Sequence, residues 1–444
     1  MFVEEPSMVV HYPALAARVR SQAVLQPALY GAVDFATTPY RHTADPGTRS
    51  TLHPRMGRRA ATLDDERIVE LIGITTLLGD VVADPYAALE PRYGTKTLVA
   101  MLRRACAKGV DAVPEAPDEL RAFLAAMETP PTWLNMELVE EGARLARVGA
   151  ALTSPFITRG VFLATFLNTY AALPMSLTGA LTGKRAARRI NETANFFAVT
   201  TLPGALERRG EGFEAAAMVR LMHSTVRFHA LTRPGAWNRE VYGIPIPQVD
   251  QMPAGTVGSY LLALKARRRC RDFDASERAI IEFNRYRCFL LGLPEELLPT
   301  TAEGIIGIFH GRAALLRDDF DGDTCGALVR SSMDAYLRPH RTPFDLAASR
   351  VEKAWSKTSF AIAFCGGRPA KAARMGVDFT PGDLALVAMT APFIVGRTIG
   401  AEIGARNPRV HPAVDRYLTR LIRRRLATYG HPEFVSDGAT YTRA

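Results

Sequence analysis

Cysteine is scarce in this chain, and acidic side chains are outnumbered by basic ones. Among 444 residues there are five cysteines and no Cys-x-x-Cys pair, which excludes a disulfide framework and is typical of free thiols in a reducing compartment. The net charge of +10 permits an anionic partner. However, the arginines are scattered along predicted helices without a nucleic-acid-binding motif, so no nucleic-acid partner is expected.

Motifs of three common functional classes are also missing. No phosphate-binding loop follows the pattern Gly-x-x-x-x-Gly-Lys-Ser/Thr, and no Gly-x-Ser-x-Gly element marks a serine hydrolase. The acidic cluster Asp319-x-Asp321-x-Asp323 lacks the central glycine and the terminal glutamate of a calcium-binding EF-hand. The sequence therefore offers no support for a nucleotide, hydrolase or EF-hand site.

A long apolar leader is lacking at the N-terminus, where acids occur within the first residues, so we predict no signal peptide and a cytoplasmic location. The uncharged stretch 161–183 is long enough to cross a bilayer. Asn168, Thr169 and Pro174 interrupt it, and we therefore predict a buried helix rather than a transmembrane span. Peripheral membrane contact stays open.

What the chain does have is helical periodicity over most of its length, with 48% hydrophobic residues and no convincing alternating strands. The first predicted helix begins at Leu63, with Asp64 and Asp65 in its opening turn. The further predicted helices are 95–108, 116–127, 133–147, 156–172, 184–199, 213–231, 256–270, 277–291, 301–318, 323–337, 343–364, 381–404 and 411–428. The long segment 233–255 is rich in Pro and Gly and predicts a loop, and Ser276 is the predicted cap of the helix at 277–291. The fold class is therefore all-α.

These composition and periodicity patterns divide the chain into four regions. Residues 1–60 predict an extended N-terminal arm, 61–149 an N-terminal helical region, 150–400 the catalytic domain and 401–444 a C-terminal helical extension.

The first candidate site element is Arg189-Ile190-Asn191-Glu192-Thr193. On a helix, Arg189 and Thr193 stand one turn apart on the same face. Such an arginine could polarise a bound group, and a threonine hydroxyl could relay a proton. Glu192 could act as a general base if burial raises its pKa, or it could simply form a salt bridge with Arg188 or Arg189. The plain alternative for the arginines is a solvated helix face.

The second element runs from Arg220 to Arg227 and contains His223, which falls within an apolar helical stripe. The apolar members of that stripe are Val219, Met222, Val226 and Ala230. A neutral imidazole flanked by cations suits a flat apolar ligand with anionic groups, such as haem. His223 would bind the iron, and Arg220 or Arg227 would pair with the propionates. The alternatives are a core histidine without a ligand, and His229 as the ligand, although His229 lies off the stripe.

The order and spacing of these two elements resemble the latex-clearing-protein (rubber oxygenase) family, to which the mycophenolic-acid-pathway oxygenases are related. Further agreement comes from Tyr242–Gln248, Asn284–Tyr286 and Leu291–Pro299, so the resemblance spans roughly residues 150–400. It implies a globin-like helical core that binds haem b (iron protoporphyrin IX) and activates O2 to oxidise an apolar organic substrate.

The resemblance also implies a role for each candidate residue. His223 becomes the proximal haem iron ligand, and Arg227 and Arg220 become cofactor-binding residues. Arg189, Glu192 and Thr193 become the catalytic residues on the distal side, where O2 binds.

Two departures from the family bear on the substrate. Glu192 stands where the rubber oxygenases have a lysine, and a carboxylate cannot replace a lysine as a donor. Those enzymes also carry a glutamate upstream of the distal element, whereas no acidic residue lies between Glu141 and Glu192 here. We therefore expect a small apolar intracellular metabolite rather than polyisoprene.

Three alternative functions remain at this point. The protein could be a haem-dependent hydroxylase or oxidase that tailors a natural product, a non-catalytic haem- or O2-binding protein, or a helical binder of apolar ligands without haem.

Overall fold

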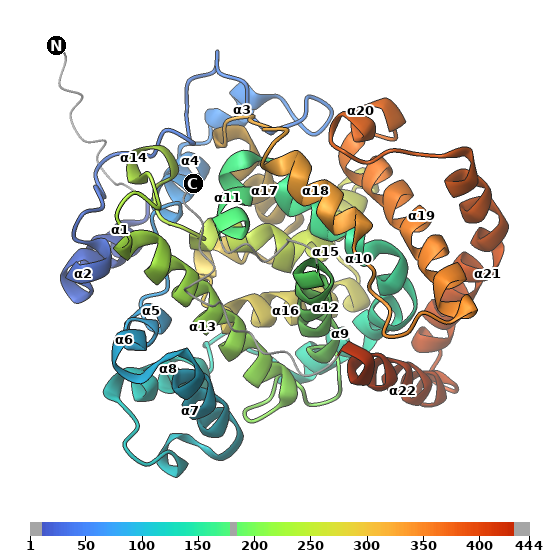
Figure 1. Ribbon diagram of the computed structural model, residues 1–444, viewed down its shortest axis with the longest axis horizontal. Helices are drawn as coiled ribbons and strands as arrows, with labels where there is room; N and C mark the ends of the chain where they lie inside the picture. Colours follow the sequence, from blue (N-terminus) through green and yellow to red (C-terminus); the bar gives the residue numbers. More distant parts are fainter. Residues whose placement is uncertain (1–10, 178–183, 430–444) are drawn as a thin grey trace. The chain divides into compact units, whose positions relative to one another are not determined.

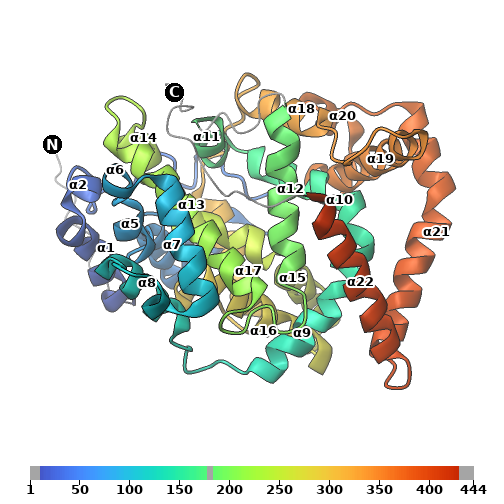
Figure 2. The same cartoon turned by 60° about the horizontal axis from the view of Figure 1, so that its bottom comes forward.

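The computed structural model describes residues 11–177 and 184–429 and consists mainly of helices (Figure 1, Figure 2). No strand occurs within the described residues, where isolated bridges pair His42 with Leu316 and Ser50 with Arg317. The all-α class predicted from periodicity is confirmed. The globin-like character of the core stays a prediction.

The chain forms two compact units. Unit 1 contains the described residues of Met1–Asn135 and Ala216–Asp319, and unit 2 those of Met136–Ala215 and Phe320–Phe434. The helices of unit 1 are α1 (Pro13–Leu25), α2 (Pro27–Tyr30), α3 (Arg59–Leu63), α4 (Glu66–Thr75), α5 (Ala83–Ala87), α6 (Glu90–Tyr93), α7 (Thr95–Lys108), η1 (Val110–Ala112), α8 (Asp118–Glu128), α13 (Glu211–Thr232, from Ala216 onward), α14 (Arg239–Tyr242), α15 (Gln248–Arg268), α16 (Ala275–Leu290), η4 (Glu295–Leu297) and α17 (Ala302–Leu315). The helices of unit 2 are α9 (Met136–Val148), η2 (Gly149–Thr153), α10 (Ser154–Leu163), η3 (Ala164–Phe166), α11 (Thr169–Leu177), α12 (Lys184–Val199), α18 (Cys325–Asp334), α19 (Pro343–Cys365), α20 (Pro369–Arg374), α21 (Pro381–Arg406) and α22 (His411–Tyr429).

Each unit is assembled from separate stretches of chain, so the units cut across the four regions that the sequence predicts. Within the predicted extended arm, residues 13–30 form α1 and α2. Leu15, Ala16 and Val19 on α1 are buried, and their spacing of one to four residues gives α1 an inward face. The four predicted regions stay predictions of how the chain is organised.

In unit 1, α15 packs against both α16 and α17. Their shared core includes Ala263 on α15, Ile281 on α16 and Ile306 on α17, which are all buried. Burial of the two isoleucine side chains contributes about 1.5–3 kcal/mol each relative to exposure. This core holds α15 in place, and the first residue of α15 is Gln248.

In unit 2, α10 and α19 lie side by side and make an extensive contact (Figure 1). Gly160 makes this approach possible, because a Cβ atom there would lie 2.5 Å from the backbone oxygen of Ser356 on α19. The buried residues Phe162, Ile190 and Phe360 bring α10, α12 and α19 into one apolar cluster. The helix that carries the first candidate element is thus anchored in the core of unit 2.

The uncharged stretch 161–183 is divided in the structure among α10, η3 and α11, and its last residues, 178–183, lie outside the described part. Phe162, Phe166 and Leu173 are buried, as expected for a core segment. Within residues 11–177 and 184–429, two helical segments are long and apolar enough to cross a membrane, by length and composition alone. They are Met136–Phe166, with a mean hydropathy of 1.2 and 39% buried, and Pro381–Arg406, with a mean hydropathy of 1.6 and 0% buried.

Two predicted boundaries were wrong. Helix α16 is capped by Asp274 rather than Ser276, in a capping box in which the Asp274 side chain accepts from the Glu277 amide and the Glu277 side chain accepts from the Asp274 amide. The predicted loop 233–255 ends early, because α15 begins at Gln248 and contains Pro253. Pro253 lies in the second turn of α15, where it removes one backbone hydrogen bond from the helix.

Glu277 predicts an acid-sensitive contact in unit 1. Hydrogen bonds from Arg271 lower the pKa of Glu277, and Lys265 adds to this effect while burial opposes it. The net shift of the pKa is from 4.5 to about 2. The resulting stabilisation is complete above the unfolded-state pKa and is lost as the pH falls toward the folded-state value. We expect Glu277→Gln to flatten the fall of the unfolding midpoint between pH 4.5 and 2, measured by urea titration at several pH values. Glu303→Gln, an exposed acid in the first turn of α17, is the control and should follow the unmodified chain. An equally steep fall for Glu277→Gln would contradict the prediction.

Candidate functional site

The second candidate element lies on α13, which is buried over most of its surface. The predicted apolar stripe is confirmed, since Val219, Met222, Val226 and Ala230 are all buried. Arg220 and Arg227 are buried on the same helix, whereas His223 is only partly buried. A helix with two buried cations needs compensating anions in its surroundings.

Arg227 is compensated by Asp84. Its Nη1 donates to the Asp84 carboxylate, its Nε to the carbonyl oxygen of Pro245 at 3.0 Å and its Nη2 to that of Ile246 at 2.8 Å. The Tyr30 hydroxyl donates to the same carboxylate. Burial alone would lower the pKa of Arg227, but the adjacent Asp84 raises it above its ordinary value. The three nitrogens of this guanidinium are therefore engaged within unit 1.

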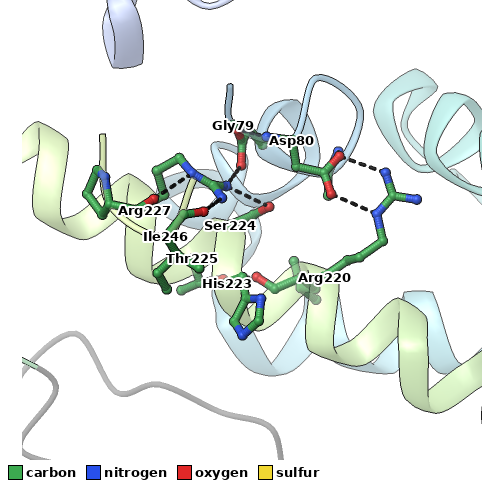
Figure 3. A network of polar contacts seen from close by, with 12 residues as sticks. Gly79, Asp80, Arg220, His223, Ser224, Thr225, Arg227 and Ile246 are labelled. Carbon is green, nitrogen blue, oxygen red and sulfur yellow. Dashed lines mark hydrogen bonds and ion pairs between the residues drawn. The ribbon is translucent and has the colours of Figure 1, made fainter. Parts of the chain in front are cut away.

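Arg220 is compensated by Asp80 in a bidentate pair (Figure 3). Nε and Nη2 each lie 2.7 Å from a carboxylate oxygen, and both side chains are almost fully buried. Burial acts to raise the pKa of the Asp80 carboxyl, but the charge and hydrogen bonds of Arg220, together with the Ala83 amide and Arg227, lower it below its ordinary value. The Arg220 guanidinium also lies 5.1 Å above the ring of Phe123.

Asp80 and Asp84 were not identified from the sequence as site residues. A signal was present, because two acids four residues apart interrupt an otherwise apolar run from Leu77 to Ala88. Carboxylates in such surroundings require a cationic partner, and Arg220 and Arg227 are the arginines that fill this need. Pairing of the two arginines with haem propionates stays a prediction. In the structure Asp80 and Asp84 occupy the guanidinium groups that the propionates would need.

His223 points away from the Arg220–Asp80 ion pair in Figure 3. Its Nδ1 lies 2.8 Å from Oε1 of Gln251, which comes from the first turn of α15. Gln251 in turn contacts Gln248, whose side chain is fully buried. The competing histidine, His229, has its Nε2 2.7 Å from Glu90 Oε2. Because Nε2 of His229 faces this carboxylate, His229 is the less suitable of the two histidines as an iron ligand.

The first candidate element lies on α12 in unit 2. Glu192 lies 3.2 Å from Arg188 and 3.7 Å from Arg189, so the salt bridge considered above is present. The Thr193 hydroxyl donates to the carbonyl oxygen of Arg189 at 3.1 Å. Asn191 anchors the same turn by donating to the carbonyl oxygen of Leu337.

The six predicted site residues thus fall into two sets. Arg220, His223 and Arg227 share one helix of unit 1, and Arg189, Glu192 and Thr193 share one helix of unit 2. Among residues 11–177 and 184–429, no group of three or more His, Cys, Asp or Glu side chains could hold a metal ion. Haem iron needs only one or two protein ligands, so a single histidine is the donor set to consider.

Comparison with known proteins gives one family and one solved structure. The family model described as "ER-bound oxygenase mpaB/B'/Rubber oxygenase, catalytic domain" matches residues 146–395. The solved structure of latex clearing protein in its closed state is similar with a TM-score of 0.55 and 18% sequence identity, over 80% of this chain and 91% of that one. At this identity the likeness concerns the fold. A sequence search of curated proteins gave no match.

Proposed function

The chain belongs to the oxygenase family of mpaB, mpaB' and the rubber oxygenases, and from this membership we propose that it is a haem b-dependent oxygenase. In this proposal it uses O2 to oxidise a small apolar organic substrate. The observation that carries the proposal is His223, a partly buried imidazole in an apolar helix stripe whose Nδ1 is hydrogen-bonded to a neutral amide oxygen. The family supports an oxygenase, and His223 supports the haem.

His223 fits the requirements of a haem ligand on chemical grounds. An amide oxygen can only accept, so the contact with Gln251 places a proton on Nδ1. Metal-bound histidines generally donate their other ring N–H to a nearby acceptor, which fixes the ring orientation. Met222 and Val226, buried on the same helix, supply the apolar surroundings that a porphyrin requires.

We assign Arg220 and Arg227 to positioning rather than to the propionates. Arg227 has no exposed side-chain surface, and its three nitrogens have partners. Arg220 is engaged by a bidentate carboxylate. Displacing either aspartate would leave a buried charge without compensation, which costs several kcal/mol. In our proposal these two ion pairs fix the position and rotation of α13 within unit 1. Because His223 lies on the same helix, they also fix the position of its ring.

For the distal side we retain Arg189, Glu192 and Thr193, on the basis of the family resemblance. The ion pairs of Glu192 favour a role in orienting Arg189 over a role as a general base. Burial lowers the pKa of Arg189, and Glu192 opposes this shift. The Thr193 hydroxyl, which donates to Arg189, can accept a further hydrogen bond from a ligand.

Haem, when bound, would supply the redox chemistry with O2 that amino-acid side chains cannot perform. The chain's own contribution would be to ligate through His223, to exclude water and to place an apolar substrate. The absence of an acid between Glu141 and Glu192 supports a substrate other than polyisoprene.

The proposal is tested by titrating the purified full chain with hemin and recording absorption spectra. We expect a Soret band that saturates at one hemin per chain and shifts after dithionite and carbon monoxide. Oxygen uptake with a panel of apolar alkenes, followed by product analysis under ¹⁸O₂, then separates the functions. Labelled carbonyls indicate cleavage, labelled alcohols indicate hydroxylation, and reversible O2 binding without uptake indicates a carrier. A chain that stays colourless with hemin would overturn the haem-dependent function.

A further inference from the structure

A row of side-chain amides connects His223 to the backbone of unit 1. His223 Nδ1 lies 2.8 Å from Gln251 Oε1, Gln251 Nε2 donates to Gln248 Oε1 at 2.9 Å, and Gln248 Nε2 donates to the carbonyl oxygen of Gly79 at 3.1 Å. Gln248 is fully buried and Gln251 is 9% exposed. Water therefore has little access to these groups, and each must be satisfied by the next.

The backbone carbonyl at the end of this row fixes the direction of every hydrogen bond in it. The Gly79 oxygen can only accept, so Gln248 must turn its NH2 group toward it and its oxygen toward Gln251. Gln251 must then donate to Gln248, which turns its own oxygen toward His223. Reversing either amide would bring two acceptors or two donors together in a buried place.

The carbonyl end of the row is itself held in place. The Gly79 amide donates to Gln22 Oε1 at 2.7 Å, and the Gln248 amide donates to the carbonyl oxygen of Leu78 at 2.9 Å. Gly79 also has no room for a side chain, because a Cβ atom would lie 2.0 Å from the Tyr30 hydroxyl. Asp80, the next residue, is the partner of Arg220. The segment 78–80 thus anchors both α13, which carries His223, and the side-chain amides of Gln248 and Gln251.

We infer that Gln251, oriented by Gln248, is a positioning residue that holds His223 in the tautomer with the proton on Nδ1 and the lone pair on Nε2. This inference rests on the proposed function, in which Nε2 is the atom that binds iron. A neutral amide acceptor polarises the imidazole less than a carboxylate does, so Gln251 also makes His223 a weaker electron donor than a carboxylate partner would.

The tautomer is tested first, on the full chain without hemin. We would label histidine with ¹⁵N and record long-range ¹H–¹⁵N spectra, with His223→Ala to identify the His223 signals. The expected result is a protonated Nδ1 and an unprotonated Nε2 in the unmodified chain, and a mixture of tautomers in Gln251→Leu. Thr256→Val is a matched control, because it removes a buried hydroxyl from α15 whose partner is the carbonyl oxygen of Met252. It should leave the His223 signals unchanged.

Hemin binding provides the second readout. We expect Gln251→Leu to bind hemin about 10–100-fold more weakly, as is typical when a group behind a metal ligand is lost. Gln251→Glu keeps an acceptor for Nδ1 but loses the donor to Gln248 Oε1, so it should bind hemin more tightly than Gln251→Leu and have a lower ferric/ferrous reduction potential than the unmodified chain. Thr256→Val should match the unmodified chain in both.

The outcomes separate this inference from the proposed function. A proton on Nε2 in the unmodified chain overturns the inference, and this result requires no variant to fold. Gln251→Leu with an unchanged tautomer and unchanged hemin affinity also overturns it. If hemin binds equally well to His223→Ala, the assigned ligand is wrong, yet the tautomer measured without hemin still decides whether Gln251 orients His223.

Discussion

Replacing His223 by alanine is expected to abolish tight hemin binding, with a loss of affinity of at least about 100-fold. The estimate follows because changing a group behind a metal ligand already costs about 10–100-fold, and this change removes the ligand itself. The side chain is only partly buried, so the fold should tolerate its removal. Gln251 Oε1 would lose its contact with the imidazole, which is worth about 1 kcal/mol. The measurement is a hemin titration followed by the Soret band, with circular dichroism to check that the helices persist.

His229→Ala is the matched control for this experiment, because it removes an imidazole from the same helix six residues later. His229 faces Glu90, with its Nε2 2.7 Å from a carboxylate oxygen. We expect His229→Ala to retain the hemin affinity of the unmodified chain. If His229→Ala loses hemin while His223→Ala keeps it, then the ligand is His229, six residues further along α13, and the assignment of His223 is wrong.

Replacing Asp84 by alanine is expected to lower the free energy of unfolding of unit 1 by about 3–5 kcal/mol. This is the usual cost of removing one partner of a buried ion pair, because the remaining charge is left without compensation. Arg227 and Asp84 have 0% and 1% exposed side chains, so solvent screening is minimal. The Tyr30 hydroxyl would lose its acceptor at the same time. Urea denaturation followed by circular dichroism measures the loss. If two transitions are seen, the one that Asp84→Ala moves to lower urea concentration is assigned to unit 1.

The exposed pair of Arg121 with Asp111 provides the comparison, since its side chains are 46% and 96% exposed. Asp111→Ala is expected to cost less than about 1 kcal/mol. The double variant Asp84→Leu with Arg227→Met should be more stable than Asp84→Ala, because it removes both charges together. Equal stability of Asp84→Ala and Asp111→Ala would show that the buried pair does not hold unit 1 together.

The helices of this protein were accessible from the sequence because each depends on local signals. The predicted ranges 95–108 and 184–199 coincide with α7 and α12. The spacing of apolar residues and the glycines that flank α7 are local properties of the sequence. They can therefore be recognised before the fold is known. The same holds for the stripe that places His223 among buried residues.

Boundaries set by side-chain choice were less accessible. Asp274 and Ser276 are both good helix caps, and only the geometry of the first turn shows that Asp274 accepts the hydrogen bond from Glu277. Pro253 suggested a continuing loop, yet it lies inside α15, because tertiary packing can override the unfavourable helix propensity of a proline.

The sequence by itself determined that this chain is helical, that Arg220, His223 and Arg227 share one buried helix, and that the spacing of its motifs matches an oxygenase family. Only the tertiary structure decided what surrounds these residues. Two of their partners, Asp80 and Asp84, come long before α13 in the chain, and Gln251 comes after it. Their contacts with α13 depend on how the helices pack. The physical reason is that a helix fixes the direction of its own side chains over a few residues, whereas a buried charge or imidazole is satisfied by whichever distant group the packed core brings within hydrogen-bonding distance.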